Sequence, residues 1–473
     1  MIQEIKQYIS ELATTFGAKV GSENGNSYII RNNVSDDVLN DKYAYFGFIE
    51  PEEGTSGQYH DFSLVIFPTN NEKAWLISLA VGSSGFKNDY ELASYPGVRR
   101  LFKNLITENG YCKSDFTDIE SSLPKSFTGR EDLRHLKNTI SRYSKFLPVC
   151  EIIQDPSSEN SKKTIAAFVA AYAQLRNWPN NNDQRKAVNT ALTPFVQKKV
   201  INTTSEVINL MKERKFVVLQ GPPGTGKTRT AKEAALNNNA KVFFTQFHAE
   251  TSYSDFIYGI RPDTSKETLL YKENLGVFSQ AIKHAIDHTN ENVVLIIDEI
   301  NRANLANVLG PIFYLFEHKI EQSDIEIEIA PGISINRLPP NFYVIATMNT
   351  ADRSLAVVDF ALRRRFAWYI VQPQPLDGKY SKGVTQLTND NSFYNNDFDE
   401  ISKIFNWYAS SEELSLQPGQ GYFIAQTEEE MTNRIKYEIF PLIKEYLQEG
   451  LLLSAKEEFN TYFINRINLS LVD

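Results

Sequence analysis

The sequence predicts an α/β fold with a parallel sheet, preceded by an α+β domain and followed by a helical subdomain. Three observations support this prediction. Apolar runs that are typical of buried parallel strands occur at 215–220, 292–298 and 342–349. Four strand patterns rich in aromatic and β-branched residues lie between residues 28 and 82. Spaced apolar residues at 429–448 indicate a helix near the carboxyl end.

Four segments are expected along the chain. They are an amino-terminal α+β domain at 1–153, a helical linker at 154–200, an α/β core at 201–375 and a helical lid at 376–473. The polar, turn-rich segment Asp155–Lys163 marks the first boundary. A chain of 473 residues is long enough for several domains, each with a core of its own.

The composition is that of an ordinary globular protein, with 42% hydrophobic and 23% charged residues. The two cysteines, Cys112 and Cys150, lie far apart in the sequence, which suggests buried neutral thiols in a reducing compartment. The histidines form no metal-spaced cluster with them, so no structural zinc is expected. The amino terminus lacks the apolar core of a signal peptide, and no run is long enough to span a bilayer. We therefore expect a cytoplasmic protein without a membrane partner.

The stretch GPPGTGKT carries the most specific motif of the chain, G-x-x-x-x-G-K-[ST]. It follows an apolar strand pattern and precedes a helical one. Glycines let backbone N–H groups converge on phosphate, the lysine supplies a cation, and the hydroxyl reaches Mg²⁺. The motif therefore predicts a site for a nucleoside triphosphate. The candidate residues are Gly221, Pro222, Pro223, Gly224, Thr225, Gly226, Lys227 and Thr228.

The apolar run at 292–298 ends in a carboxylate residue, and a second carboxylate residue follows directly. A carboxylate at the carboxyl end of a parallel strand beside a phosphate loop can hold Mg²⁺, and the next one can polarise the attacking water. Asp298, together with Thr228, is therefore the candidate Mg²⁺ ligand. Glu299 is the candidate base.

The third apolar strand ends in Asn349, and Asp352 follows. An asparagine both donates and accepts, so Asn349 can sense a γ-phosphate or orient water. Three consecutive arginines at 363–365 follow on a helical stretch and cannot all face one direction. One of them can reach across a subunit boundary to stabilise charge on a neighbour's phosphates. A solvated basic face is the alternative interpretation of this run.

In this order of strands and motifs, the chain resembles the AAA+ ring NTPases, whose core is a phosphate-loop α/β domain. Three stretches look more specifically like the McrB family: Thr245–Pro262, Ile296–Gly310 and Met348–Phe366. The last carries the M-N-x-x-D element of that family. A fainter resemblance covers the lid stretches Pro418–Ile424 and Ile439–Leu447.

The resemblance assigns roles to the candidate residues. It implies that the glycine-rich loop holds GTP or ATP, with Thr228 and Asp298 around Mg²⁺. It implies that Glu299 activates water. The residues that it assigns to positioning that water are Asn301, Asn349 and Asp352, and those that it places at the subunit boundary are Arg364 and Arg365.

The family also implies properties that none of these motifs carries. Its members form hexameric rings, prefer GTP over ATP and turn over slowly until a separate McrC-type nuclease subunit engages the ring. They serve in DNA restriction and antiviral defence. By this resemblance we expect a homo-hexamer that works with a nuclease partner, and we find no nuclease motif in the chain itself.

Charge argues against a broad DNA-binding face. The formal net charge is −9, and residues 1–130 hold fewer basic than acidic side chains. If that region binds DNA, modified or not, it must use a local patch or a pocket for one base. Arg99, Arg100 and Lys103 form a tight basic group, or simply a solvated helix face. Aromatic residues that can stack on a base, or pack a core, are Tyr43, Tyr45, Phe48, Tyr59 and Trp75.

Two classes of function remain open from the sequence. The first is the McrB-like motor, which the stretch at 348–366 favours. The second is a MoxR-like AAA+ chaperone whose ring remodels protein partners, which the acidic balance keeps open. A purely regulatory nucleotide switch would lack the catalytic carboxylate, whereas Glu299 is present.

Overall fold

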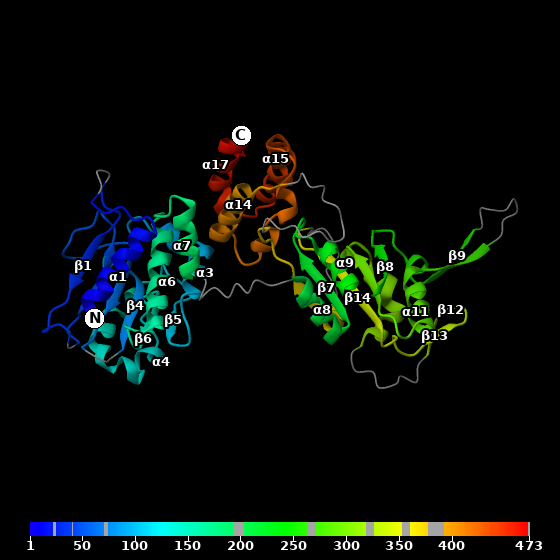
Figure 1. The fold of residues 1–473 in the computed structure, drawn as a ribbon, viewed down its shortest axis with the longest axis horizontal. Helices are drawn as coiled ribbons and strands as arrows, with labels where there is room; N and C mark the ends of the chain where they lie inside the picture. Colours follow the sequence, from blue (N-terminus) through cyan, green and yellow to red (C-terminus); the bar gives the residue numbers. More distant parts are fainter. Residues whose placement is uncertain are drawn as a thin grey trace. The chain divides into compact units, whose positions relative to one another are not determined.

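A computed structural model describes residues 1–21, 25–39, 41–70, 74–192, 203–262, 271–317, 326–351, 360–376 and 392–471. The chain forms two compact units, Met1–Lys199 and Val200–Asp473 (Figure 1). Among the described helices, none combines the length and the apolar character that crossing a membrane requires.

The first unit is built on a six-stranded sheet in the order β1-β2-β3-β4-β6-β5, with every neighbouring pair antiparallel. The predicted α+β character of this region is confirmed, and β1 to β4 are the four predicted strands. Two strands, β5 and β6, were not predicted. The bounds are β1 Ile29–Asn33, β2 Tyr45–Ile49, β3 Phe62–Phe67, β4 Trp75–Val81, β5 Gly110–Cys112 and β6 Val149–Ile153.

Helices cover this sheet and continue past the expected end of the domain. Their bounds are α1 Ile2–Thr15, α2 Tyr90–Ser94, α3 Pro96–Lys103, α4 Lys125–Thr128, α5 Lys137–Tyr143, α6 Glu159–Leu175 and α7 Asn182–Leu192. The sequence interpretation assigned 154–200 to a linker, but α6 packs against α1, β3 and β4. Every residue from 165 to 173 is buried. A helix that is apolar on all sides belongs in a core, and the alanines of α6 allow close packing.

The aromatic residues of the first unit are mainly packing residues. Phe48 and Trp75 are completely buried, so neither can stack on a base from solution. The guanidinium of Arg142 lies over the Tyr43 ring, 4.4 Å from its centre. The hydroxyl of Tyr59 is hydrogen-bonded to a neighbouring strand residue. The core interpretation of these aromatics therefore holds for Phe48 and Trp75.

The two cysteines lie on neighbouring strands, where Cys112 of β5 follows the residue that pairs with Cys150 of β6. Both thiols are free. Burial raises the pKa of Cys112 to about 12 and raises that of Cys150 as well. Both side chains are therefore protonated and unreactive at neutral pH, as predicted.

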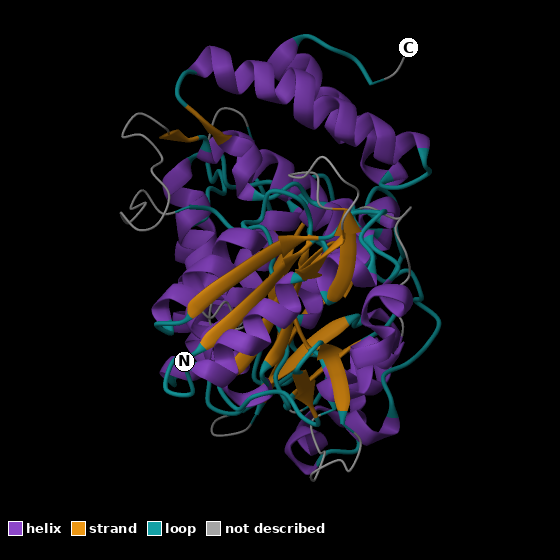
Figure 2. Ribbon diagram, turned by 90° about the vertical axis from the view of Figure 1, so that its right-hand side faces the viewer, coloured by secondary structure: helices purple, strands orange, loops and turns teal. Residues whose placement is uncertain are grey.

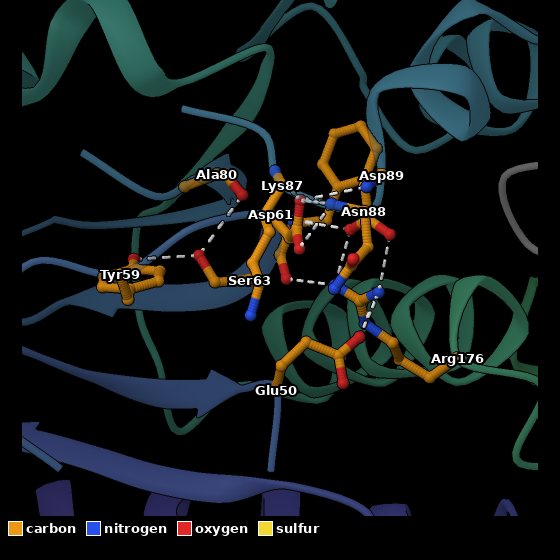
Figure 3. Close-up of polar contacts among 10 residues, drawn as sticks. Glu50, Tyr59, Asp61, Ser63, Ala80, Lys87, Asn88, Asp89 and Arg176 are labelled. Carbon is orange, nitrogen blue, oxygen red and sulfur yellow. Dashed lines mark hydrogen bonds and ion pairs between the residues drawn. The ribbon is translucent and has the colours of Figure 1, made fainter. Parts of the chain in front are cut away.

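A buried ionic cluster joins α6 to the sheet (Figure 3). Arg176, just beyond α6, donates to both carboxylate oxygens of Asp89 at 3.0 and 2.8 Å and forms an ion pair with Glu50. Asp61, in the left-handed region with φ of 66°, accepts backbone N–H groups of the segment that leads to Asp89. Burial raises the pKa of Glu50, while Arg176 lowers it. One cation thus pairs with two carboxylates.

Replacing Arg176 with Leu should destabilise the protein strongly. The substitution leaves the buried Asp89 and the partly buried Glu50 without their cation, a change that costs about 3–5 kcal/mol. We expect the midpoint temperature of thermal unfolding to fall by about 10 °C for a unit of this size, as measured by calorimetry on the intact chain. Arg134→Leu, which breaks the exposed pair with Glu131, is the matched control and should cost less than about 1 kcal/mol. Equal midpoints for the two variants would contradict a stabilising role of the cluster.

The second unit contains the predicted parallel sheet, in the order β15-β7-β14-β11-β8. The bounds are β7 Phe216–Gly221, β8 Lys241–Gln246, β11 Val293–Asp298, β14 Phe342–Asn349 and β15 Ala367–Ile370. Strand β14 therefore lies between β7, which ends at the phosphate-loop motif, and β11, which ends at Asp298. The carboxyl ends of all three strands meet at one edge of the sheet.

Helices pack on both faces of this sheet. Val217 and Leu219 of β7 face α8 and α9, whereas Phe216 and Val218 face the opposite cluster with α11 and α12. The helices and remaining strands of this core are α8 Thr203–Arg214, α9 Lys227–Asn237, α10 Tyr253–Phe256, β9 Tyr258–Pro262, β10 Tyr271–Leu275, α11 Val277–Asp287, α12 Leu305–Leu309, β12 Ile327–Ala330, β13 Ile333–Ile335 and α13 Phe360–Arg365. The alternation along β7 is that of a strand buried on both sides.

The carboxyl-terminal part is helical, apart from one short strand pair (Figure 2). Its elements are β16 Ser392–Phe393, α14 Asn395–Tyr408, β17 Ile424–Ala425, α15 Glu428–Arg434, α16 Phe440–Gln448 and α17 Lys456–Ile467. A π-helical segment, Ile435–Ile439, joins α15 to α16, so the predicted helix at 429–448 is continuous but widened. These helices enclose a hydrophobic cluster of their own. The predicted helical lid is therefore present.

Candidate nucleotide-binding site

The glycine-rich loop connects the end of β7 to the start of α9. Gly224 and Gly226 have φ angles of 78° and 81°, a region that glycine enters without steric cost. The loop ends directly at Lys227, the first residue of α9. The amino terminus of this helix therefore opens onto the loop, where unpaired N–H groups and the helix dipole favour an anion.

Lys227 is held against the loop itself. Its ammonium donates to the carbonyl oxygens of Gly221 at 2.9 Å and Pro222 at 2.8 Å. The residue is only 8% exposed, and burial lowers its pKa to about 8, although Glu299 and Asp298 oppose that shift. A buried cation at a helix amino terminus is well suited to an anionic ligand such as a phosphate.

Asp298 lies at the centre of a hydrogen-bond cluster drawn from two strands and one helix. Its Oδ1 accepts from the hydroxyl of Thr228, at the start of α9, at 2.6 Å. The same oxygen accepts from the hydroxyl of Thr347, near the end of β14, also at 2.6 Å. The predicted pair of Thr228 and Asp298 is therefore in direct contact.

Glu299 follows Asp298 in an unusual backbone conformation, with φ of 55° and ψ of 50°. A non-glycine residue in the left-handed region costs about 1 kcal/mol or more and is often found at functional sites. Its backbone N–H donates to Thr347 Oγ1 at 3.1 Å, and its carboxylate lies 3.4 Å from Arg302 Nε. The conformation directs the chain into a short 3₁₀ turn, Ile300–Arg302.

Asn301, in the 3₁₀ turn after β11, lies beside Asn349 at the end of β14. The Asn301 amide donates to the Asn349 carbonyl at 3.4 Å, and Asn349 Oδ1 accepts from the Ala351 N–H at 3.2 Å. Asn301 is buried, and its Oδ1 has no hydrogen-bond partner in the part of the chain that the structure describes. Asn349 pairs in register with Gly221, the first residue of the loop. Asp352 lies outside the described residues.

Arg364 and Arg365, at the end of α13, share one carboxylate. Both guanidinium groups lie 2.5 Å from Glu317 Oε1. Arg364 is 72% exposed, whereas Arg365 is 14% exposed and covers the Phe313 ring at 4.5 Å. The two arginines therefore differ in their access to solvent.

The lid contacts the glycine-rich loop through the segment 418–423. The Gly419 N–H donates to the Pro223 carbonyl and the Gly421 N–H to the Gly224 carbonyl, each at 2.9 Å. The Gln420 amide donates to the Thr225 carbonyl at 2.9 Å. The Tyr422 ring lies so close to Gly224 that a side chain there would clash with it. The lid thus holds the outer side of the loop through three consecutive carbonyls.

Sequence analysis missed three residues of this region: Thr347, Glu317 and Gln420. Thr347 stands two residues before Asn349, so the two-residue period of a strand predicts that both face the same side. That signal was present in the sequence. The roles of Glu317 and Gln420 depend on contacts between distant segments, which no local pattern reveals.

The oxygen donors of the cluster fit Mg²⁺. Mg²⁺ is usually held by one or two carboxylates together with hydroxyl, water and phosphate oxygens. Thr228 and Asp298 provide one hydroxyl and one carboxylate in contact with each other. Among the described residues, no group of three or more His, Cys, Asp or Glu side chains could hold a metal by itself. The fit therefore depends on a phosphate that completes the set of ligands.

Comparison with known proteins matches this architecture. Residues 216–366 match the family model of the AAA domain, dynein-related subfamily. The chain is 36% identical over 187 residues to the EcoKMcrB subunit of a type IV methyl-directed restriction enzyme from Escherichia coli K12, covering 38% of this chain and 39% of that protein. The α/β core carries a McrB-like AAA+ domain.

Two further relatives match part of the chain. The YdiS component of the type II restriction enzyme BsuMI from Bacillus subtilis is 29% identical over 205 residues, or 35% of this chain and 59% of that protein. The vesicular-fusion protein SEC18 of Candida albicans is 29% identical over 224 residues, or 44% of this chain and 26% of that protein. The chain thus spans less than two thirds of each of these relatives. The domain supports NTPase activity in general terms, and two of the three relatives belong to restriction systems.

Proposed function

We propose that this protein is the NTP-hydrolysing motor of a DNA restriction or antiviral defence complex, with GTP as the preferred nucleotide over ATP. The observation that carries the proposal is the contact of Thr228 with Asp298, directly followed by the strained Glu299, at the mouth of the glycine-rich loop. Similarity to two restriction-system subunits supports the biological setting.

In this proposal the loop and the start of α9 bind the triphosphate, and Lys227 neutralises its terminal phosphates. Thr228 and Asp298 hold Mg²⁺, which would supply Lewis-acid stabilisation of phosphate charge when bound. Glu299 accepts a proton from the attacking water, because its carboxylate follows the ligand pair directly in the chain, with Arg302 as its neighbour at 3.4 Å. The residues that we propose to orient this water are Asn301, Asn349 and Asp352.

The unpartnered Oδ1 of Asn301 supports its part in this proposal. A buried acceptor without a donor costs free energy unless a water or a ligand satisfies it. Asn301 also lies against the carbonyl of Asn349, whose strand ends opposite Gly221. A water that bridges these groups would lie near the terminal phosphate.

We further propose that the chain acts as a homo-hexameric ring, in which Arg364 and Arg365 contact the nucleotide of a neighbouring subunit. Their common partner Glu317 keeps two cations together on one exposed helix end. An arginine supplied in trans stabilises charge that develops on the transferred phosphoryl group. The pair with Glu317 must open, or be shared, when an arginine reaches a phosphate.

Mixing two inactive variants tests this arrangement. A variant with Arg364→Ala and Arg365→Ala, mixed in equal amounts with Glu299→Gln, should regain hydrolysis. Random mixing gives an intact interface at about one boundary in four, so we expect about a quarter of the normal rate in steady-state assays. Absence of activity in rings that are shown to contain both variants would contradict the role in trans.

The partners of the ring are proposed from the same similarity. A separate McrC-type nuclease subunit would cut the DNA, and the first unit would bind DNA, modified or unmodified. The helix α3 presents Arg99 and Lys103 to solvent, which gives a small basic surface in that unit. We expect a cytoplasmic setting, where NTP and reduced thiols are available.

A second candidate is a MoxR-like AAA+ chaperone that remodels protein partners. The formal net charge of −9 and the similarity to the vesicular-fusion protein SEC18 favour this alternative. The negative charge of DNA repels an acidic protein. Many protein ligands carry no such charge and do not repel it. The two candidates share the same nucleotide chemistry and differ in nucleotide preference and ligand.

Side-by-side hydrolysis of GTP and ATP by the purified chain tests the proposal, with Glu299→Gln as the blank. A preference for GTP supports the restriction motor. Hydrolysis of ATP alone would favour the chaperone instead. No hydrolysis of either nucleotide above the blank, with and without DNA, would contradict both candidates.

A further inference from the structure

Thr347 is hydrogen-bonded to both Asp298 and Glu299, and none of the motifs assigns it a role. It lies on β14, the strand between β7 and β11, and it is completely buried. Ile297 of β11 pairs in register with Ala346, so Asp298 and Thr347 follow at the same level of the sheet. On the other side, Thr347 pairs with Leu219 of β7. The residue therefore lies between the strand that leads to the loop and the strand that ends at Asp298.

Its hydroxyl makes two hydrogen bonds of opposite sense. It donates its one proton to Asp298 Oδ1 at 2.6 Å and accepts the backbone N–H of Glu299 at 3.1 Å. A hydroxyl has one proton and two lone pairs, so these bonds fix its orientation. The Thr347 proton is therefore committed to Asp298 Oδ1. Thr228 donates to the same oxygen, so two hydroxyl groups together hold it in place.

The second bond supports the strained residue. Glu299 has left-handed backbone angles, and such a conformation persists only where the surroundings hold it. The Thr347 oxygen satisfies the N–H that this conformation turns into the protein. Loss of the hydroxyl would leave that N–H without its acceptor and would remove one donor from Asp298.

We propose that Thr347 is a positioning residue that sets the carboxylate of Asp298 for Mg²⁺ and the backbone of Glu299 for water activation. This inference rests on the proposed function, since it assigns Thr347 to the same site. Thr347 does not itself reach the phosphates or the metal. It acts through the two carboxylate residues, so its removal should impair Mg²⁺ use and turnover together.

Three variants test the proposal on the intact chain. Thr347→Val keeps the shape and removes the hydroxyl, Thr347→Ser keeps the hydroxyl, and Thr245→Val is the matched control. Thr245 lies on β8, the other neighbour of β11, beside Ile297. The first readout is equilibrium binding of a non-hydrolysable GTP or ATP analogue titrated with Mg²⁺, and the second is the rate of hydrolysis.

For Thr347→Val we expect the Mg²⁺ concentration at half-maximal enhancement of binding to rise by about tenfold or more. Turnover should fall by about 10–100-fold, while binding of the analogue without Mg²⁺ stays within about twofold of normal. Thr347→Ser and Thr245→Val should match the unmodified protein within about threefold. Wild-type Mg²⁺ dependence and turnover in a folded Thr347→Val protein would overturn the proposal.

Should Thr347→Val not fold, Thr347→Ala decides in its place, because it also lacks the hydroxyl and adds no bulk. A Thr347→Ala protein with normal Mg²⁺ dependence would likewise overturn the proposal. The outcome is distinct from failure of the proposed function. If the unmodified chain neither binds nor hydrolyses nucleotide, the function fails, whereas normal activity in the variants removes only the role of Thr347.

Discussion

Glu299→Gln is expected to reduce hydrolysis by about 100-fold or more while nucleotide stays bound. The substitution removes the base that accepts a proton from water, and general base catalysis typically contributes 10²–10⁴-fold. Glutamine has the same length, so the left-handed backbone at this position is not placed under additional strain. Steady-state hydrolysis and equilibrium binding of the same nucleotide measure the two effects separately.

Glu291→Gln is the matched control, because Glu291 precedes the start of β11 and lies at the opposite end of that strand from Glu299. It pairs with His284 there and should leave hydrolysis unchanged. Undiminished turnover in Glu299→Gln would exclude Glu299 as the base. Loss of binding as well as turnover would assign it instead to the nucleotide pocket.

Lys227→Ala is expected to weaken nucleotide binding by at least about 30-fold. Removing one partner of a buried, hydrogen-bonded charge pair typically costs 2–5 kcal/mol. Without nucleotide the variant should be no less stable than the unmodified chain, because burial already disfavours the lysine charge. Thermal midpoints with and without nucleotide measure this, and nucleotide should raise only that of the unmodified chain. Lys232→Ala, on the exposed side of the same helix, is the control.

The lowered pKa of Lys227 adds a pH dependence with a definite sign. With a pKa of about 8 in the free protein, the lysine loses its proton as pH rises past 8. Bound phosphates favour the charged form, so binding takes up a proton at high pH. Affinity should therefore fall by about tenfold between pH 7 and pH 9. A dissociation constant that is flat over this range would contradict the buried-lysine account.

The strand ends of the nucleotide core were predictable because their signal is local. A phosphate loop after an apolar run, and carboxylates after a second one, place Lys227 and Asp298 without knowledge of the fold. Strand order is not encoded in this way. That β14 lies between β7 and β11 follows from packing, and this order is what brings Thr347 to Asp298.

The first unit was less predictable for a related reason. An alanine-rich apolar helix is compatible with a linker or with a core, and only the apolar faces of α1 and the sheet decide between them for α6. The pairing of Arg176 with Asp89 and Glu50 likewise joins segments that are far apart in the sequence. The role of Asp352 stays a prediction.

The three hydrogen bonds between segment 418–423 and the glycine-rich loop connect the lid directly to the loop. Because consecutive carbonyls of the loop are hydrogen-bonded to the lid, we expect a change in the shape of the loop to move the helical subdomain with it. In that case the helices α14 to α17 would transmit the state of the loop to the surface of the subdomain. A side chain at Gly419 would clash with the backbone of Gly224 and Thr225, so this close approach of lid and loop requires a glycine.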